Sequence, residues 1–267
     1  MAFNVLNDFE KVERIIKENQ DNNEINISDY SFISPSTLLP LIHYMEENNI
    51  SNIYSSDEKI QEYIYSVLGK KEQCDNIIHI QRLKNHNHKF NIERYLDDTT
   101  DKIFNMLQLD INLNGFYLIL YELLLNIYNH SKFNNAYVLC QRYPNDGTAD
   151  ICIIDNGISI PGSFEESEID FINDAEAIFN AINGTSSNKE KSGLKGRGLN
   201  TIVRFVSLGF KEEKLIVSRN GLCSINQKGA ILKKLDNDII KGTFISLRLN
   251  NEKFNETSYE LTKIERL

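Results

Sequence analysis

The chain has 267 residues, of which 41% are hydrophobic and 25% are charged, and its formal net charge is −9. These proportions are typical of a globular protein that buries one large core or two modest ones. The acidic balance argues against nucleic-acid binding through broad phosphate contacts. No run approaches the roughly 18 apolar residues of a membrane helix, and the first residues lack a signal-peptide layout. We therefore expect a cytoplasmic protein with neither nucleic-acid nor membrane partners.

The first 85 residues are predicted to form a small α/β unit. The expected elements alternate along the chain: a helix over 7–20, a strand over 24–28, a helix from Pro35, a strand over 49–56 and a helix over 57–69. Ser34 and Pro35 suit the N-cap and the first position of the second helix. A polar stretch at 84–91 marks the predicted boundary with a second domain, residues 86–267.

The second domain is predicted to begin with helices and to continue mainly as strands. Helices are expected near 93–108 and through 116–125, and strands over 136–143 and 148–155 are joined by PNDG, a turn sequence. A helix over 198–209 precedes KLIVSRN, GLCSINQKG, AILKKL and GTFISLRLN, which alternate like an antiparallel meander. We expect an α+β fold, with an antiparallel sheet covered on one face by helices.

The cysteines form neither a metal-binding nor a disulfide pattern. They are scattered, without a CxxC pair or histidines at zinc-finger spacing: Cys74, Cys140, Cys152 and Cys223. We interpret them as reduced, mostly buried thiols and expect no metal bound by cysteine.

The helix through 116–125 carries a polar stripe. It reads FYLILYELLL, which is apolar or aromatic at every position except Glu122. Glu122, Asn126 and His130 are four residues apart and so share one face of a helix, with Asn129 beside them. Such groups are costly in apolar surroundings unless they are paired. By itself the stripe fits either a buried polar network or a binding site.

Asp155 ends a buried strand, ADICIID, and is followed by Asn-Gly. A carboxylate in this place can accept a hydrogen bond from an exocyclic amine such as N6 of adenine. Gly157 would let a flat base approach the backbone. The alternative is an ordinary Asp-Asn-Gly turn.

A glycine-rich segment, SGLKGRGLNTIVRF (192–205), precedes an apolar helix. Its backbone N–H groups and the positive helix end can face a phosphate, and Lys191, Lys195 and Arg197 add positive charge. The alternative is a mobile loop, because a glycine cluster alone is a weak signal. Farther on, Gly242 and Thr243 open the last long strand.

Taken in order, these four segments resemble the nucleotide-binding domain of the GHKL superfamily, the histidine-kinase-like ATPases. The similarity covers roughly residues 100–250 and the motifs Glu122–Ser131, Asp155–Pro161, Gly196–Thr201 and Gly242–Thr243. It implies a Bergerat-type α/β sandwich, which is a mixed, mostly antiparallel sheet covered by helices. Residues 162–195 would be an ATP lid that contains a short helix over 174–183.

The resemblance implies a site for ATP and Mg²⁺. Asn126 would complete the coordination of Mg²⁺ beside the ATP phosphates, and Glu122 would be the general base. Asp155 would contact adenine, with Gly157 making room for it. Further nucleotide contacts implied by the resemblance are Asn129, His130, Ile160, Lys195, Gly196, Arg197, Gly198, Leu199 and Thr243.

Two positions depart from the family pattern. Ser159 and Asn200 stand where many members have glycine, which puts turnover in question more than binding. The chain also lacks the H-E-[IL]-[RK] helix of histidine kinases, and His43 is interpreted as an ordinary helix-face residue.

Residues 25–69 resemble, more distantly, a STAS domain of anti-sigma-factor antagonists. Ser34, Ser36 and Thr37 stand where such domains carry a phosphorylatable serine, although the usual Asp-Ser-Ser-Gly is absent. A helix cap is the alternative interpretation of these side chains.

The resemblance implies a bacterial signalling protein that binds Mg-ATP and acts through a change in its lid. It would hydrolyse ATP, or transfer the γ-phosphate to a serine or threonine of a partner protein, as kinases of the anti-sigma-factor type do. The alternative is a nucleotide-sensing interaction module without significant catalysis. A protein partner is expected as the regulatory target, and a homodimer is left open.

Overall fold

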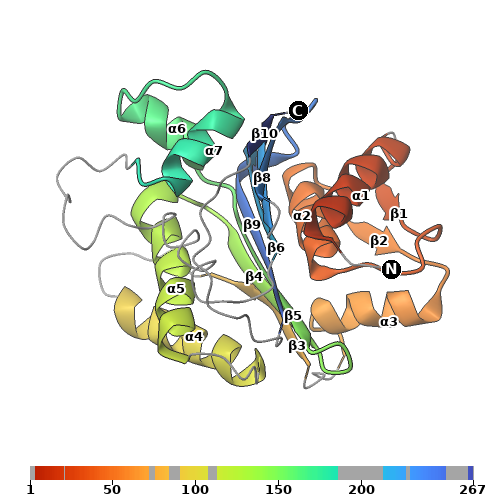
Figure 1. Ribbon diagram of the computed structural model, residues 1–267. Coiled ribbons are helices and arrows are strands. Elements are labelled where there is room, and N and C mark those ends of the chain that lie inside the picture. The colour runs from red at the N-terminus through yellow and green to blue at the C-terminus, as the bar shows by residue number, and fades with distance from the viewer. Residues whose placement is uncertain are drawn as a thin grey trace.

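One eight-stranded sheet forms the middle layer of the structure (Figure 1). The computed structural model describes residues 4–20, 22–71, 76–83, 91–107, 113–185, 213–226, 229–250 and 264–266. The strands of this sheet are β3 (Ile77–Arg82), β4 (Ala136–Tyr143), β5 (Thr148–Asp155), β6 (Glu213–Arg219), β7 (Gly221–Asn226), β8 (Gly229–Lys234), β9 (Ile240–Asn250) and β10 (Ile264–Arg266). Their spatial order is β10-β8-β7-β6-β9-β5-β4-β3. All neighbours are antiparallel except β10, which runs parallel to β8.

The last four long strands form a Greek key, so the predicted meander is wrong in its final step. β6, β7 and β8 follow one another as hairpins, but β9 returns to pair with β6 and lies between β6 and β5. The predicted strands themselves are confirmed. Alternation along a strand reports which face each side chain occupies and says nothing about which neighbour the strand will choose.

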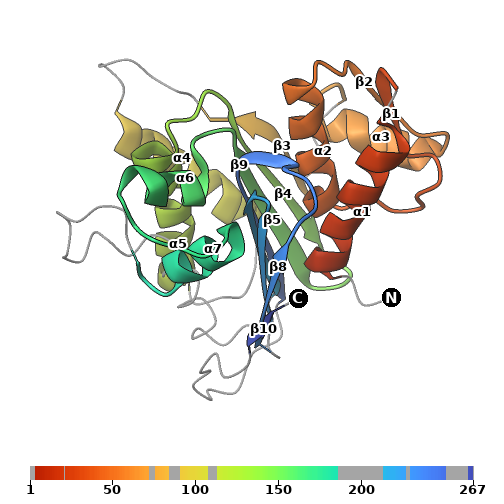
Figure 2. The same ribbon diagram turned by 90° about the horizontal axis from the view of Figure 1, so that it is seen from above.

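Helices cover both faces of the sheet, where the sequence predicted cover on one face (Figures 1 and 2). One face is covered by α4 (Ile92–Leu107), α5 (Leu113–Asn126), α6 (Ser159–Glu166) and α7 (Asp174–Ile182). The other is covered by an N-terminal layer: α1 (Val5–Glu18), α2 (Pro35–Glu47) and α3 (Glu58–Val67), with the parallel pair β1 (Glu24–Asn26) and β2 (Asn52–Tyr54). Within the described ranges, no helix combines the length and apolar character needed to cross a bilayer.

The two helix layers enclose two hydrophobic cores that share the sheet. Along β5, Ile151 and Ile153 belong to the core under α4–α7, whereas Cys152 and Ile154 belong to the core under α1–α3. Burial on both faces explains why this strand reads as a continuous apolar run. The cysteines in the described residues, at 140, 152 and 223, are all buried free thiols.

The N-terminal elements agree with the sequence prediction to within a few residues. Asn4 caps α1 by accepting a hydrogen bond from the Leu6 amide at 2.8 Å, and Asp57 caps α3 through the Lys59 amide at 2.8 Å. Gly69 lies just past α3 with a φ of 68°, the left-handed conformation that favours glycine. Ser34 occupies the predicted N-cap position of α2 without capping it, because its hydroxyl donates to Asp8 Oδ2 at 2.9 Å.

Strand β3 precedes the predicted domain boundary at residue 85 and yet pairs with β4 in the large sheet. The N-terminal layer and the sheet therefore share both a core and a strand. The division into residues 1–85 and 86–267 stays a prediction.

A buried ionic network fastens the N-terminal layer to the sheet. Arg248 on β9 binds Asp150 on β5 with two hydrogen bonds, of 2.6 and 2.7 Å, and also donates to Asp8 on α1 at 3.1 Å. Two parallel hydrogen bonds between a guanidinium and a carboxylate fix orientation as well as energy. Because all three side chains are buried, replacing Arg248 would leave two carboxylates without their shared counter-ion.

We expect Asp8→Ala to lower the free energy of unfolding by about 3 kcal/mol, because it removes two buried hydrogen bonds, the charged one from Arg248 and the one from Ser34. Lys11→Ala is the matched control, since Lys11 contacts the same carboxylate from its more exposed side at 2.9 Å. It should cost less than about 1 kcal/mol. Urea unfolding of both variants measures the difference, and equal losses would contradict a buried anchor.

Candidate functional site

Polar side chains line up across three strands at one end of the sheet, and the row continues to an alanine on a fourth strand. Ser218 on β6 pairs with Thr243 on β9, Thr243 pairs with Asp155 on β5, and Asp155 pairs with Ala136 on β4. Directly paired residues point to the same face of a sheet, and Ala136 belongs to the core under α4–α7. This row therefore faces the layer of α4–α7.

Asp155 is the buried acid of this row, with 4% of its surface exposed. Its Oδ1 accepts a hydrogen bond from the Gly157 amide at 2.8 Å. Burial raises the pKa of Asp155 to about 7, and the Gly157 amide and the nearby Ser131 hydroxyl oppose that rise. Burial thus favours the protonated form of this carboxyl, and an incoming N–H donor would favour its charged form.

Two glycines let three backbone segments meet beside Asp155. A Cβ at Gly157 would lie 1.9 Å from the carbonyl oxygen of Ser131, and one at Gly242 would lie 2.3 Å from the carbonyl oxygen of Asp155. The Ile158 amide also donates to the Ser131 carbonyl at 2.7 Å. Gly157 is therefore required by packing within the chain, a reason that the sequence did not reveal. Room for a flat base stays a prediction.

Ser218 is a site residue that sequence reasoning missed. Its hydroxyl donates to the Gly242 carbonyl at 2.9 Å, lies 3.0 Å from Thr243 Oγ1 and accepts from the Ile160 amide at 3.0 Å. It thereby satisfies an amide in the first turn of α6, which has no partner within its own helix. The available signal was a lone serine in the apolar strand KLIVSRN. The predicted contact Ile160 is itself packed in the core under α4–α7.

Ser159 adopts the backbone conformation of a glycine. Its φ of 73° lies in the left-handed region, and its hydroxyl accepts a hydrogen bond from the Gly162 amide at 3.1 Å. No helix was predicted here: the resemblance assigned Asp155–Pro161 to a nucleotide-binding motif and 162–195 to a lid, and residues Ser159–Glu166 form α6. Arg219 holds this helix to the end of β6 through two 2.7 Å hydrogen bonds to Glu165.

The polar stripe of α5 runs into a π-helical turn, η1 (Ile127–Ser131). Glu122 and Asn126 keep their α-helical spacing, but the wider turn places Asn129 and His130 differently from an uninterrupted α-helix. Burial raises the pKa of Glu122 above its usual range. Asn126 Nδ2 is buried and has no hydrogen-bond partner among the described residues. His130 is partly buried and Asn129 is exposed.

Three of the four predicted motif segments thus meet, the first only through its last residue: Ser131 of η1 contacts Gly157 and Ile158, and the end of β5 pairs with the start of β9. The fourth, with Lys195, Gly196, Arg197, Gly198 and Leu199, lies outside the described residues, as does the helix predicted over 198–209. Within the predicted lid, the helix expected over 174–183 is confirmed as α7. It packs on β6, β7 and β8, and a Cβ at Gly221 would lie 2.4 Å from the backbone of Asp174.

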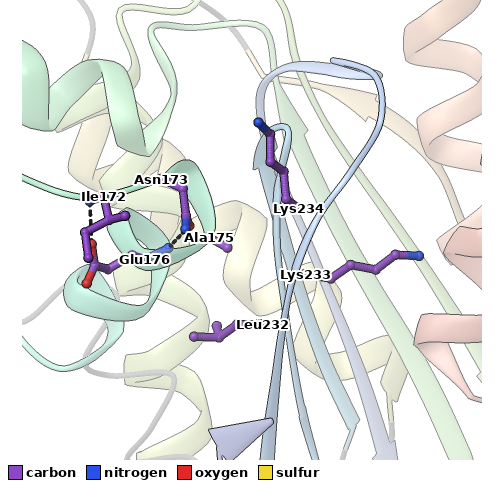
Figure 3. A pocket seen from close by; sticks show the side chains of 7 residues that line it. All are labelled: Ile172, Asn173, Ala175, Glu176, Leu232, Lys233 and Lys234. Carbon is purple, nitrogen blue, oxygen red and sulfur yellow. Dashed lines mark hydrogen bonds between the residues drawn. The ribbon is translucent and has the colours of Figure 1, made fainter. Parts of the chain in front are cut away.

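A small cavity lies elsewhere, between the start of α7 and β8 (Figure 3). Its volume is about 120 Å³, too small for a nucleotide-sized ligand. Its lining residues are Ile172, Asn173, Ala175, Glu176, Leu232, Lys233 and Lys234. No group of three or more His, Cys, Asp or Glu side chains within the described ranges is arranged to hold a metal ion by itself.

Comparisons of the chain with protein-family models, with curated proteins and with solved structures gave no match.

The positive φ of residue 159 should make a glycine variant more stable than an alanine variant at this position, the reverse of their usual order. Elsewhere alanine is more stable, but at a positive φ its Cβ costs about 1 kcal/mol or more. Both Ser159→Gly and Ser159→Ala lose the bond from the Gly162 amide, so their difference isolates the backbone term. We expect the glycine variant to unfold at higher urea concentration than the alanine variant. The opposite order would contradict the left-handed conformation.

Asp155 should make stability fall as pH rises. Its folded pKa of about 7 lies above its ordinary value of 3.8, so the folded state binds the proton more tightly than the unfolded state between these values. Asp155→Asn lacks this titration. The free energy of unfolding of Asp155→Asn, relative to that of the wild type, should increase from about pH 4 and level off near pH 8. The total increase should be on the order of 4 kcal/mol. Urea unfolding without nucleotide at pH 5, 6, 7 and 8 tests this, and a constant difference would contradict it.

Proposed function

We propose that this chain binds Mg-ATP where η1, the end of β5 and the start of β9 meet, as a regulatory protein of the GHKL superfamily. The observation that carries the proposal is the buried carboxyl of Asp155, flanked by close-packed Gly157 and Gly242. The Gly157 amide offsets only part of the cost of burying this carboxylate, and the N6 amine of adenine is a further donor of the right kind. Because burial raises the pKa of Asp155, a donor that favours the charged form would offset part of the cost of burial.

The α+β architecture is compatible with the Bergerat-type sandwich that we propose for the C-terminal part. A sheet with seven antiparallel strands and the layer of α4–α7 on the site face supports it. For the N-terminal layer, the short parallel pair β1–β2 with α1–α3 supports a STAS-like unit.

Asn126 and Glu122 are the proposed phosphate-side residues. Mg²⁺ takes few protein ligands and completes its shell with phosphate oxygens and waters, so the absence of a larger cluster in the described ranges is compatible with it. The amide oxygen of Asn126 would hold the ion, which neutralises phosphate charge. Glu122, whose pKa is raised by burial, would take a proton from water or from a substrate hydroxyl.

A phosphoacceptor within α2 is not favoured. Ser34, Ser36 and Thr37 are fully buried, and their hydroxyls bond to Asp8 or Ser246. A kinase activity would therefore act on a serine or threonine of a partner protein. The alternative, a nucleotide sensor with little catalysis, gains support from a contact between the N-terminal layer and the site, the 2.8 Å hydrogen bond from Asn156 to Glu47.

Calorimetry with Mg-ATP tests the proposal. The ionised carboxylate of Asp155 is the form that accepts a hydrogen bond from the N6 amine. Affinity should therefore be about tenfold higher at pH 8 than at pH 6, because the fraction of protein with an ionised Asp155 rises. Asp155→Asn should bind more weakly and lose the part of the pH dependence that Asp155 contributes, and GTP, without the N6 amine, should bind poorly. No heat beyond dilution with the wild-type protein would refute the proposal.

Turnover separates the two forms of the proposal. Glu122→Gln keeps the shape of the side chain but cannot take a proton, so it should retain Mg-ATP affinity and lose at least 100-fold in ADP or phosphoprotein formation. Formation of ADP by the wild type that does not depend on Glu122 would contradict its role as base. Binding without any product favours the sensor.

A further inference from the structure

The last turn of α2 contacts the end of the sheet that carries the candidate site, on the face opposite to α4–α7. The Tyr137 hydroxyl donates to the carboxylate of Glu46, 2.8 Å from each oxygen. Asn156 Nδ2 donates to Glu47 Oε1 at 2.8 Å, and Lys241 Nζ donates to Glu47 Oε2 at 3.3 Å. Two neighbouring glutamates of α2 thus contact β4, the loop after β5, and β9.

Two of these contacts fall on immediate chain neighbours of the row described above. Tyr137 follows Ala136 and Asn156 follows Asp155, whereas Lys241 lies two residues before Thr243. Alternate residues of a strand point to opposite faces, so an element on one face can set the position of residues on the other through their shared backbone. The site therefore has α5–η1 and α6 on one side and the end of α2 on the other.

Asn156 is the link between α2 and the site. Its Oδ1 accepts hydrogen bonds from the Asn134 and Asn135 amides at 3.0 and 2.8 Å, which forces its Nδ2 toward Glu47. One side chain thereby joins α2, the segment that follows η1, and the loop that carries Asp155. The pKa of Glu47 is lowered, mainly by the bond from Asn156 and further by Lys241, so this bond has a charged acceptor.

We propose that Glu47 is a positioning residue for nucleotide binding. Through Asn156 it holds the loop of residues 155–157 in the conformation that receives adenine, and it couples the N-terminal layer to the site. This inference rests on the ATP site proposed above. Because coupling free energies are reciprocal, bound ATP would in turn strengthen the contact between α2 and Asn156.

Two measurements on Glu47→Ala test the proposal. Mg-ATP affinity by calorimetry should fall about tenfold, the size expected for one charge-assisted hydrogen bond. Without nucleotide, hydrogen exchange at the amides of Asn134, Asn135 and Gly157 should accelerate by a similar factor. Glu47→Gln, which keeps an oxygen for Asn156, should recover most of both effects. Glu46→Ala, the comparison variant one residue away, removes the bond from Tyr137 on β4 and leaves the Asn156–Glu47 bond in place, so it should leave both within about twofold of wild type.

A double-mutant cycle separates positioning from general stability. Glu47→Ala and Asn156→Ala should not add, because each removes the same bond. If Glu47→Ala had the hydrogen-exchange rates and the ATP affinity of the wild type, the proposal would be overturned. It would also be overturned if hydrogen exchange accelerated equally in distant β7, because that would indicate a general loss of stability. If the wild type itself binds no ATP, the proposed function fails, while the exchange measurement still decides whether Glu47 holds the loop.

Discussion

Strand β9 pairs with β5 on one side and with β6 on the other, and most of the features described above depend on this insertion. At one end it brings Gly242 and Thr243 against Asp155 and Ser218. Toward the other it carries Arg248 to Asp150 and Asp8. A single strand thus builds the candidate site on one face of the sheet and anchors the N-terminal layer on the other. A change of its register by one residue would exchange these two faces.

Local signals predicted much of the fold. Helical periodicity, strand alternation and the turn PNDG located α1–α5 and the antiparallel strands β4–β9 close to their observed bounds, and the family resemblance indicated α7. Three features depended on distant contacts and were not predictable from local patterns: the position of β9, the packing of α1–α3 on the second face, and the helix α6. The last begins with Ser159, whose left-handed backbone and hydroxyl contact to Gly162 are tertiary compensations for a residue that reads as part of a turn.

Sequence patterns indicated some of the residues that meet in the candidate site but not their geometry. Asp155 and Gly242 lie together, as the resemblance implied. Gly157, however, is needed because the backbone of Ser131 packs against it, and Ser218 supplies hydrogen bonds that no motif indicated. The stripe of Glu122 and Asn126 is kept, but the π-turn after Asn126 alters the placement of Asn129 and His130. A π-turn changes the spacing of the side chains that follow it along the helix, and such turns are frequent at functional sites.

The burial of both faces of the sheet has an evolutionary consequence. Leu139, Cys152 and Leu215 pack against the N-terminal helices, and their neighbours along the same strands pack against α4–α7. If α1–α3 were replaced by a domain without a matching apolar surface, one face of the sheet would be exposed to water and would promote aggregation. The two halves are therefore expected to be inherited as one unit, with substitutions in α1–α3 accompanied by compensating substitutions in the middle strands.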